Sequence, residues 1–133
     1  MKKQAFNPYL PSWEYIPDGE PYVFGDRVYV YGSHDCFNGH VFCMGDYVCW
    51  SAPVNDLSDW RYEGVIFPKT ADPINRDGTM NLFAPDVTVG PDGRYYFQYI
   101  YHRCSRALLS KYCAWHSQLC VSIMISAENL FHH

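Results

Sequence analysis

Concentrated positive charge and long apolar runs are both missing from this sequence of 133 residues. Lysine and arginine number 10 against 14 acidic residues, the formal net charge is −4, and the basic residues form no cluster. Nucleic acids and anionic membranes bind proteins through a concentrated basic surface, so neither is expected as a partner. No apolar stretch reaches the roughly 18 residues of a membrane-spanning helix, so a membrane protein is not expected either.

Export signals are missing as well. Met1 is followed by two lysines, but the apolar segment of a signal peptide does not come behind them. The chain also contains no Asn-x-Ser/Thr glycosylation sequence. These absences predict a cytoplasmic location, in which the six cysteines are expected to be reduced thiols rather than disulfides.

The cysteines lack the Cys-x-x-Cys spacing that is typical of zinc-binding knuckles. His34 and His40 lie near Cys36 and Cys43 in the sequence, which makes only a weak metal-binding constellation. No metal or other cofactor is therefore expected. A Cys/His metal-binding protein stays open as a separate class of function.

Aromatic residues, by contrast, are plentiful, with 12 Tyr, 8 Phe and 4 Trp. Such residues favour half-buried β-sheet surfaces, and they also stack on sugar rings, so a β-rich core and a carbohydrate-binding surface both stay open. Alternating apolar and polar residues predict strands on both sides of Gly25-Asp26 and of Gly45-Asp46, each pair joined by a tight turn. A further strand is expected over 60–67, and the predicted fold class is all-β.

The first 101 residues contain an internal repeat. Pro17-Asp18 is followed nine residues later by Arg27 and a Tyr-rich segment, and Pro85-Asp86 is followed eight residues later by Arg94 and a similar segment. The offset between the two copies is 67 or 68 residues. A unit of about four strands that recurs at such an interval is typical of a β-propeller blade.

This repeat divides the chain. The first blade is predicted over about 20–67, the second from about residue 82, and the polar segment 68–81 between them is expected to be a solvated connector. Residues 102–133 contain no Gly, no Pro and a single acid, Glu128. This change of composition predicts a divergent tail of uncertain structure. Three interpretations stay open: a helical cap, a further blade strand near the end of the tail, or a segment translated outside the native reading frame.

Two carboxylates occupy matching places in the repeat, Asp18 after Pro17 and Asp86 after Pro85. The innermost strands of a propeller line its central channel, so we expect both residues at strand starts, at one end of that channel. Acids at close range shift one another's pKa, and paired carboxylates carry out glycoside hydrolysis. The alternative is that each Asp only forms a turn after its proline.

Two segments, NPYLPSWEYIPDGEPYVFGDRVYVYGSHD and LFAPDVTVGPDGRYYFQY, resemble the amino-terminal part of glycoside hydrolase family 43 over about residues 7–101. The resemblance implies a five-bladed β-propeller, of which this chain would contain about two blades with open sheet edges that could self-associate. It also implies an inverting glycosidase, similar to β-xylosidases and α-L-arabinofuranosidases, with arabinose- or xylose-containing polysaccharides or oligosaccharides as substrates.

The same resemblance implies roles for the two aspartates. Asp18 matches the general base that activates the attacking water, and Asp86 matches the carboxylate that modulates the pKa of the general acid. That acid is a glutamate on a later blade of the family, and nothing here matches it, because Glu128 has different surroundings. The Asp-Gly-Glu sequence also departs from the family's commoner Asp-Pro, which leaves Glu20 open as the functional neighbour.

A chain without the general acid is expected to be weakly active or inactive. The alternative is a non-catalytic carbohydrate-binding fragment or a degenerate one. Three residues are candidates for substrate binding: Phe83 beside the Ala-Pro-Asp motif, Trp13 as a stacking ring, and His34 in Gly-Ser-His-Asp. Core packing or turn capping stays the alternative for each of them.

Overall fold

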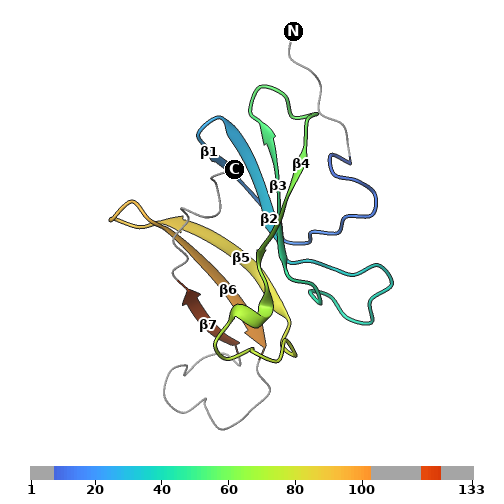
Figure 1. The fold of residues 1–133 in the computed structure, drawn as a ribbon, viewed down its shortest axis with the longest axis vertical. Helices are drawn as coiled ribbons and strands as arrows, with labels where there is room; N and C mark the ends of the chain where they lie inside the picture. The colour runs from blue at the N-terminus through green and yellow to red at the C-terminus, as the bar shows by residue number, and fades with distance from the viewer. Residues whose placement is uncertain (1–7, 103–117, 124–133) are drawn as a thin grey trace.

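The computed structural model describes residues 8–102 and 118–123, and it consists of two antiparallel β-sheets (Figure 1). The first sheet contains, in spatial order, β1 (Glu20–Phe24), β2 (Arg27–Gly32), β3 (Tyr47–Pro53) and β4 (Arg61–Phe67). The second contains β5 (Leu82–Val89), β6 (Tyr95–His102) and β7 (Gln118–Ile123). Two successive sheets of neighbouring strands form a partial β-propeller, and the all-β prediction is confirmed.

Helical structure in the described residues is limited to one 3₁₀ turn, η1 (Lys69–Ala71). None of the helices in residues 8–102 and 118–123 has the length and apolar character needed to cross a membrane.

The predicted hairpin at Gly25-Asp26 is confirmed. Phe24 pairs with Arg27 across the turn, and Gly25 has a φ of 62°. This left-handed conformation is easily adopted by glycine because it has no Cβ. The turn therefore sets the register of β1 against β2.

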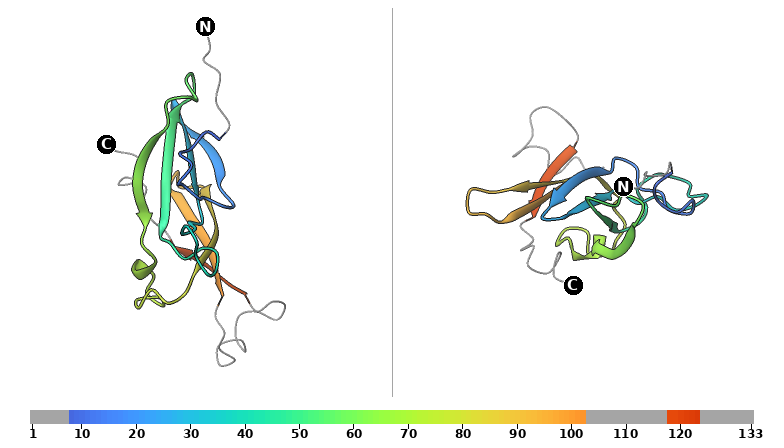
Figure 2. Two further views of the ribbon diagram at one scale, coloured as in Figure 1. Left: turned by 90° about the vertical axis from the view of Figure 1, so that its right-hand side faces the viewer. Right: turned by 90° about the horizontal axis from the view of Figure 1, so that it is seen from above.

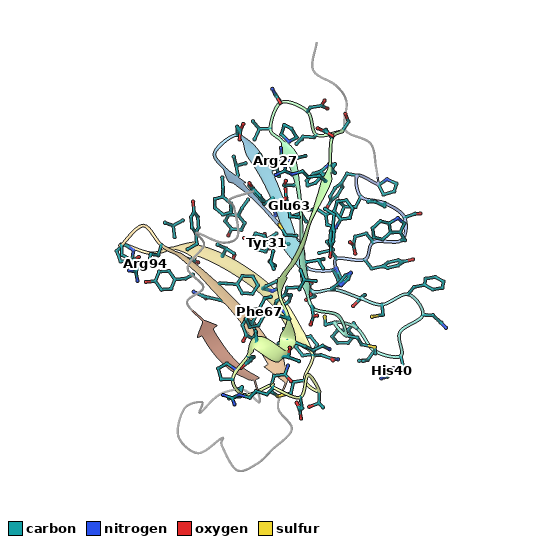
Figure 3. The ribbon with its side chains drawn as sticks, viewed as in Figure 1. Arg27, Tyr31, His40, Glu63, Phe67 and Arg94 are labelled. Atoms are coloured by element: carbon teal, nitrogen blue, oxygen red, sulfur yellow. The ribbon has the colours of Figure 1, made fainter. Side chains whose placement is uncertain are left out.

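A core of aromatic and aliphatic side chains lies between the two sheets, and Figure 3 places Tyr31 and Phe67 in it. Alternate residues of each strand point to the same face, so Tyr29 and Tyr31 of β2 meet Phe97 and Tyr99 of β6 in this layer. The Tyr31 and Phe97 rings, for example, meet edge to face with their centroids 6.3 Å apart. Alternate aromatic residues of β6 thus contribute to the packing between the two sheets.

Most of the connector 68–81 is exposed to solvent, but two of its polar residues pack inward. Asp72 and Asn75 are both buried, with 1% and 0% of their surface exposed. Asp72 accepts hydrogen bonds from the Tyr99 hydroxyl (2.8 Å) and the Ile74 amide (2.9 Å), and Asn75 bonds the backbone of Met80 in both directions. Polar residues fold inward here because each finds a partner there.

The hairpin predicted at Gly45-Asp46 is wrong as well. β3 begins only at Tyr47, and the segment 33–46 before it is an irregular loop. The Asp35 carboxylate accepts a hydrogen bond from the Cys43 amide at 2.5 Å, and the Gly45 amide donates to the His34 carbonyl at 2.8 Å. These bonds give the backbone partners within the loop, in place of a strand ladder.

A third strand joins the second sheet from the tail. β7 pairs with β6, with Phe97 opposite Ile123 and His102 opposite Gln118. Residues 103–117 and 124–133, with Glu128 among them, lie outside the described residues. The division of the chain at residue 101 and the interpretations of the tail therefore stay predictions.

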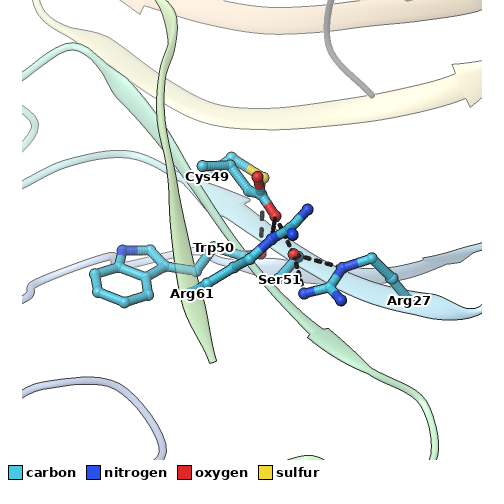
Figure 4. A network of polar contacts seen from close by, with 6 residues as sticks. Arg27, Cys49, Trp50, Ser51 and Arg61 are labelled. Atoms are coloured by element: carbon cyan, nitrogen blue, oxygen red, sulfur yellow. Dashed lines mark hydrogen bonds and ion pairs between the residues drawn. The ribbon is translucent and has the colours of Figure 1, made fainter. Parts of the chain in front are cut away.

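A polar network joins β2, β3 and β4 (Figure 4). Arg27 donates to the Ser51 hydroxyl through Nε (2.9 Å) and Nη2 (2.8 Å), the Ser51 hydroxyl donates to Glu63, and Arg61 donates to Glu63 at 2.6 Å. Partial burial raises the pKa of Glu63, but the hydrogen bonds from Ser51 and Arg61 outweigh it and hold the pKa below the ordinary value. The network therefore links the side chains of these three neighbouring strands of the first sheet.

Candidate functional site

Asp18 lies in the short loop that leads into β1, and it is exposed. Its backbone has a φ of 56°, a left-handed conformation that Asp tolerates better than most residues other than glycine. The loop places the carboxylate two residues before Glu20, where β1 begins. Asp18 therefore follows the prediction of a position at the start of a strand.

Gly32 at the end of β2 leaves the space in which the Asp18 loop packs against the strand. A methyl group at Gly32 would lie 2.5 Å from Cγ2 of Ile16, 2.9 Å from the Pro17 carbonyl oxygen and 3.0 Å from the Gly19 Cα. Contacts under 3 Å cannot be accommodated without movement, so only glycine lets the Asp18 loop approach β2 this closely. Asp18 is thus placed by backbone packing.

The buried Ser33 side chain links the segment after β2 to the second sheet, and buried Cys43 lies beside it. Burial raises the pKa of the Cys43 thiol, and the negative charges of Asp35 and Asp18 raise it further. The Ser33 hydroxyl bonds to the Cys43 sulfur, and it accepts a hydrogen bond from the Ala84 amide at 2.9 Å. Because Ser33 and Cys43 are buried, with 0% and 1% of their surface exposed, this link is shielded from solvent.

Asp86 is the fifth residue of β5, not the first, which corrects the expectation that both aspartates stand at strand starts. The pairing of β5 with β6 is irregular between Phe83 and Asp86: Phe83 is opposite Ile100 and Asp86 is opposite Gln98. Two residues of β5 therefore face one of β6, which is the geometry of a β-bulge. Ala84 within the bulge has a φ of 36°, which is rare for a residue other than glycine.

The Asp86 carboxylate is half-buried, and its Oδ1 accepts two hydrogen bonds. One comes from the Tyr22 hydroxyl of β1 at 2.9 Å, and the other from the Val87 amide at 2.7 Å. The hydrogen bond to Asp86 is the main cause that raises the pKa of the Tyr22 phenol, and burial adds to it. A residue of the first sheet thus holds the carboxylate of the second.

Phe83 lies next to this carboxylate region and contacts the 33–46 loop. Its ring centroid is 5.5 Å from that of Phe42, whose side chain is 60% exposed. The Phe83 carbonyl also accepts a hydrogen bond from the Tyr47 hydroxyl at 3.1 Å. Phe83 and Phe42 thus form an apolar pair between β5 and the 33–46 loop.

Trp13 and His34 belong to a different cluster. The Glu14 side chain, only 2% exposed, accepts hydrogen bonds from the Trp50 indole (2.7 Å) and, on its other oxygen, pairs with His34 Nε2 (2.8 Å). Trp13 is 65% exposed and its ring lies 5.9 Å from that of Trp50. Figures 1 and 2 show the segment 8–19 on the side of the first sheet that faces away from the second, with the loop 33–46 beside it.

The structure places Phe83 and Asp86 together on β5, where Tyr47 and Tyr22 of the first sheet bond to them, and it ties His34 to the amino-terminal segment through Glu14. Among the described residues, no hydrogen bond joins Asp18 to this pair. Sequence reasoning missed Tyr22 and Ser33, which connect the two sheets. The alternation in β1 marks Tyr22 as an inward residue, but nothing in the sequence pairs it with a residue 64 positions away.

In the part of the chain that the structure describes, no three His, Cys, Asp or Glu side chains lie close enough together to hold a metal ion. Cys36, Cys43 and Cys49 are free thiols. An open hollow of about 390 Å³ is lined by residues between Pro8 and Ile16, so it belongs to the amino-terminal segment and not to the two aspartates.

Comparison with known proteins gives several relatives, although no family model matches the chain. A protein named "Xylosidase/arabinosidase" from Thermoclostridium stercorarium is 76% identical over 100 residues, covering 75% of this chain and 21% of that protein. Two proteins named "Probable arabinan endo-1,5-alpha-L-arabinosidase C", from Aspergillus flavus and Aspergillus oryzae, are 36% identical over 67 residues, or 50% of this chain and 21% of each of them.

Among solved structures, an exo-β-1,3-galactanase from Clostridium thermocellum superposes with a TM-score of 0.51 at 21% identity, covering 65% of this chain and 17% of that one. This likeness concerns the fold alone. The chain spans about a fifth of the length of the curated relatives that it matches.

Proposed function

We propose that this chain belongs to glycoside hydrolase family 43 and forms the part of a glycosidase that supplies two carboxylates to the reaction centre. The substrates would be arabinose- or xylose-containing polysaccharides or oligosaccharides, in keeping with the names of the relatives. The observation that carries the proposal is the contact between the two sheets at Asp86, whose carboxylate accepts a hydrogen bond from the Tyr22 hydroxyl while Ser33 accepts one from the neighbouring Ala84 amide.

In the proposed mechanism Asp18 is the general base. Its exposed carboxylate takes a proton from a water molecule, and that water attacks the anomeric carbon from the face opposite the leaving group. A single displacement of this kind inverts the configuration of the sugar. Asp86 orients the sugar and tunes the proton donor by its negative charge.

A general acid is also required to protonate the departing oxygen, and it accounts for roughly 10²- to 10⁴-fold in rate. We assign no residue of the described part of the chain to this role. The chain alone is therefore proposed to be weakly active or inactive, with the acid supplied by the remaining length that its relatives possess. In an inverting enzyme that acid lies roughly 6.5–9.5 Å from the base.

The test is hydrolysis of aryl α-L-arabinofuranoside and aryl β-D-xyloside by the purified chain and its Asp18→Asn variant. Turnover by the parent that is lost in Asp18→Asn, with the opposite anomer as the first product in NMR spectra, supports the proposal. Asp26→Asn is the matched control, because Asp26 is an exposed aspartate in the turn at the far end of β1. Equal activity in Asp18→Asn and Asp26→Asn would exclude Asp18 as the base.

A second candidate function, non-catalytic carbohydrate binding, is favoured by the exposed aromatic rings. Trp13, Phe37 and Phe42 expose 65%, 84% and 60% of their surface, and such rings stack on sugars. This function predicts binding of arabino- or xylo-oligosaccharides in calorimetry without turnover. Binding that persists in Asp18→Asn but is lost in Trp13→Ala or Phe42→Ala would support it over catalysis.

A further inference from the structure

The bulge that bears Asp86 is held mainly from the first sheet. Three side chains reach across to it: Tyr22 donates to the Asp86 carboxylate, Ser33 accepts from the Ala84 amide, and Tyr47 donates to the Phe83 carbonyl. The distances are 2.9, 2.9 and 3.1 Å. Phe83, Ala84 and Asp86 are therefore held by hydrogen bonds from the first sheet, and Pro85 between them is held by burial.

This restraint matters because the bulge is strained. A residue such as Ala84, with a φ of 36°, keeps that conformation only when its surroundings impose it. Bulges next to active sites re-aim a side chain relative to a regular strand. Here the re-aimed side chain is Asp86, and the bond to its own strand comes only from the adjacent Val87 amide.

We propose that Tyr22 is a positioning residue for Asp86, so that the first sheet sets the orientation of the carboxylate carried by the second. The proposal rests on the function proposed above. Tyr22 and Val87 both bond to Oδ1, and no hydrogen bond from the described residues reaches Oδ2. Oδ2 is thereby the oxygen presented to the sugar or to the proton donor.

The Tyr22 ring is itself rigidly placed. It is stacked between Phe24 and Tyr31, with centroids 5.9 Å from each and interplanar angles of 10° and 16°. A ring clamped on both faces keeps its hydroxyl at one point, which is what a positioning residue requires. The negative charge of Glu20 at the start of β1 acts on the same phenol and, together with Asp86, keeps it protonated.

Tyr31 provides a matched control. It is the neighbour of Tyr22 in the stack and almost fully buried, and its hydroxyl has no hydrogen-bond partner among the described residues. Tyr22→Phe and Tyr31→Phe therefore remove the same atom from adjacent rings, but only the first removes a bond to Asp86.

The first test does not depend on activity. The full chain, labelled with ¹³C at tyrosine Cζ, is titrated by NMR, and the Tyr22 signal is assigned by its absence in Tyr22→Phe. We expect Tyr22 to titrate above the ordinary pKa of tyrosine, and to titrate at lower pH in Asp86→Ala than in the parent, with Asp86→Asn in between. A Tyr22 titration that is the same in the parent and in Asp86→Ala would overturn the contact and the proposal with it.

The second test is kinetic. In Tyr22→Phe we expect kcat on aryl glycosides to fall on the order of tenfold or more, because a small misplacement of a reacting group is costly. KM should stay within about twofold, because binding of the ground state is retained. The limbs of the pH–rate profile should shift, which a purely structural role would not cause. In Tyr31→Phe both constants and the profile should match the parent.

Identical kinetics in Tyr22→Phe and Tyr31→Phe would refute the positioning role even if the titration shows the contact. Turnover by the parent chain that persists unchanged in Asp18→Asn would instead count against the function proposed above. In that case the titration alone decides whether Tyr22 holds Asp86, so the two failures are distinguishable.

Discussion

In the first sheet Asp18 lies in a loop ahead of β1, whereas in the second sheet Asp86 lies within β5, in a bulge. Asp18 is exposed, and its loop is placed by close backbone packing against Gly32. Asp86 is half-buried and is placed by hydrogen bonds from Tyr22 and Val87. Residues at matching places in a sequence repeat are thus positioned by different physical means.

The difference has a functional meaning. A base that activates water benefits from exposure, because the water must reach it and leave again. A carboxylate that acts through its charge benefits from a fixed orientation and partial burial, since electrostatic interactions strengthen away from water. The two environments fit the two proposed roles better than an exact structural repeat would.

The largest effect is expected from Gly32→Ala, which breaks the packing that places Asp18. The added methyl group meets Ile16 and the Pro17 carbonyl at under 3 Å, so we expect a loss of about 1–3 kcal/mol from the free energy of unfolding. Urea denaturation measures it. Tyr22 should titrate as in the parent, because the Asp86 contact does not involve this loop.

Gly25→Ala is the control for that variant. Gly25 has a φ of 62° but no atom within 4 Å of an added Cβ, so it should cost only about 1 kcal/mol, through backbone strain. A Gly32→Ala variant as stable as the parent would show that the Asp18 loop is not held by its approach to β2.

A smaller effect is expected from Glu63→Gln, which acts on the first sheet without touching either aspartate. Removing the charge that Arg61 and Ser51 bind should cost about 1 kcal/mol at pH 7. Because the pKa of folded Glu63 is lowered, its contribution is full above the unfolded pKa of about 4.3 and is lost as pH falls through the folded value.

Denaturation curves of Glu63→Gln and the parent should therefore converge on acidification. Glu20→Gln, at an exposed position of the same sheet, should lie within about 0.5 kcal/mol of the parent at pH 7. A stability difference for Glu63→Gln that grows towards acid would contradict the sign of the pKa shift.

The smallest effect is expected from Tyr31→Phe, which lies between the two sheets. Its hydroxyl is buried without a partner among the described residues, and such a group costs free energy in the folded state. We expect the variant to be as stable as the parent or more stable, by up to about 1 kcal/mol, in thermal or urea unfolding. A marked loss of stability would reveal a partner for this hydroxyl.

Local features of the fold were predictable from sequence. The Gly25-Asp26 turn and the strands around it follow from glycine's freedom and from period-2 alternation. The same signal at Gly45-Asp46 misled, because Asp35 and His34 supply hydrogen bonds that hold 33–46 as a loop. Such partners lie close in sequence, but their geometry is set by the packing around Cys43.

Sequence by itself determined the all-β class, the two Pro-Asp motifs, and the resemblance to glycosidases. These depend on residue types and short spacings, which are visible in one dimension. Only the tertiary structure decided that Asp86 stands inside β5, that Tyr22 reaches it from the other sheet, and that Asp72 is buried. Contacts between residues 64 positions apart form only when two sheets pack together, and the pattern of residue types along the chain does not reveal how the sheets pack.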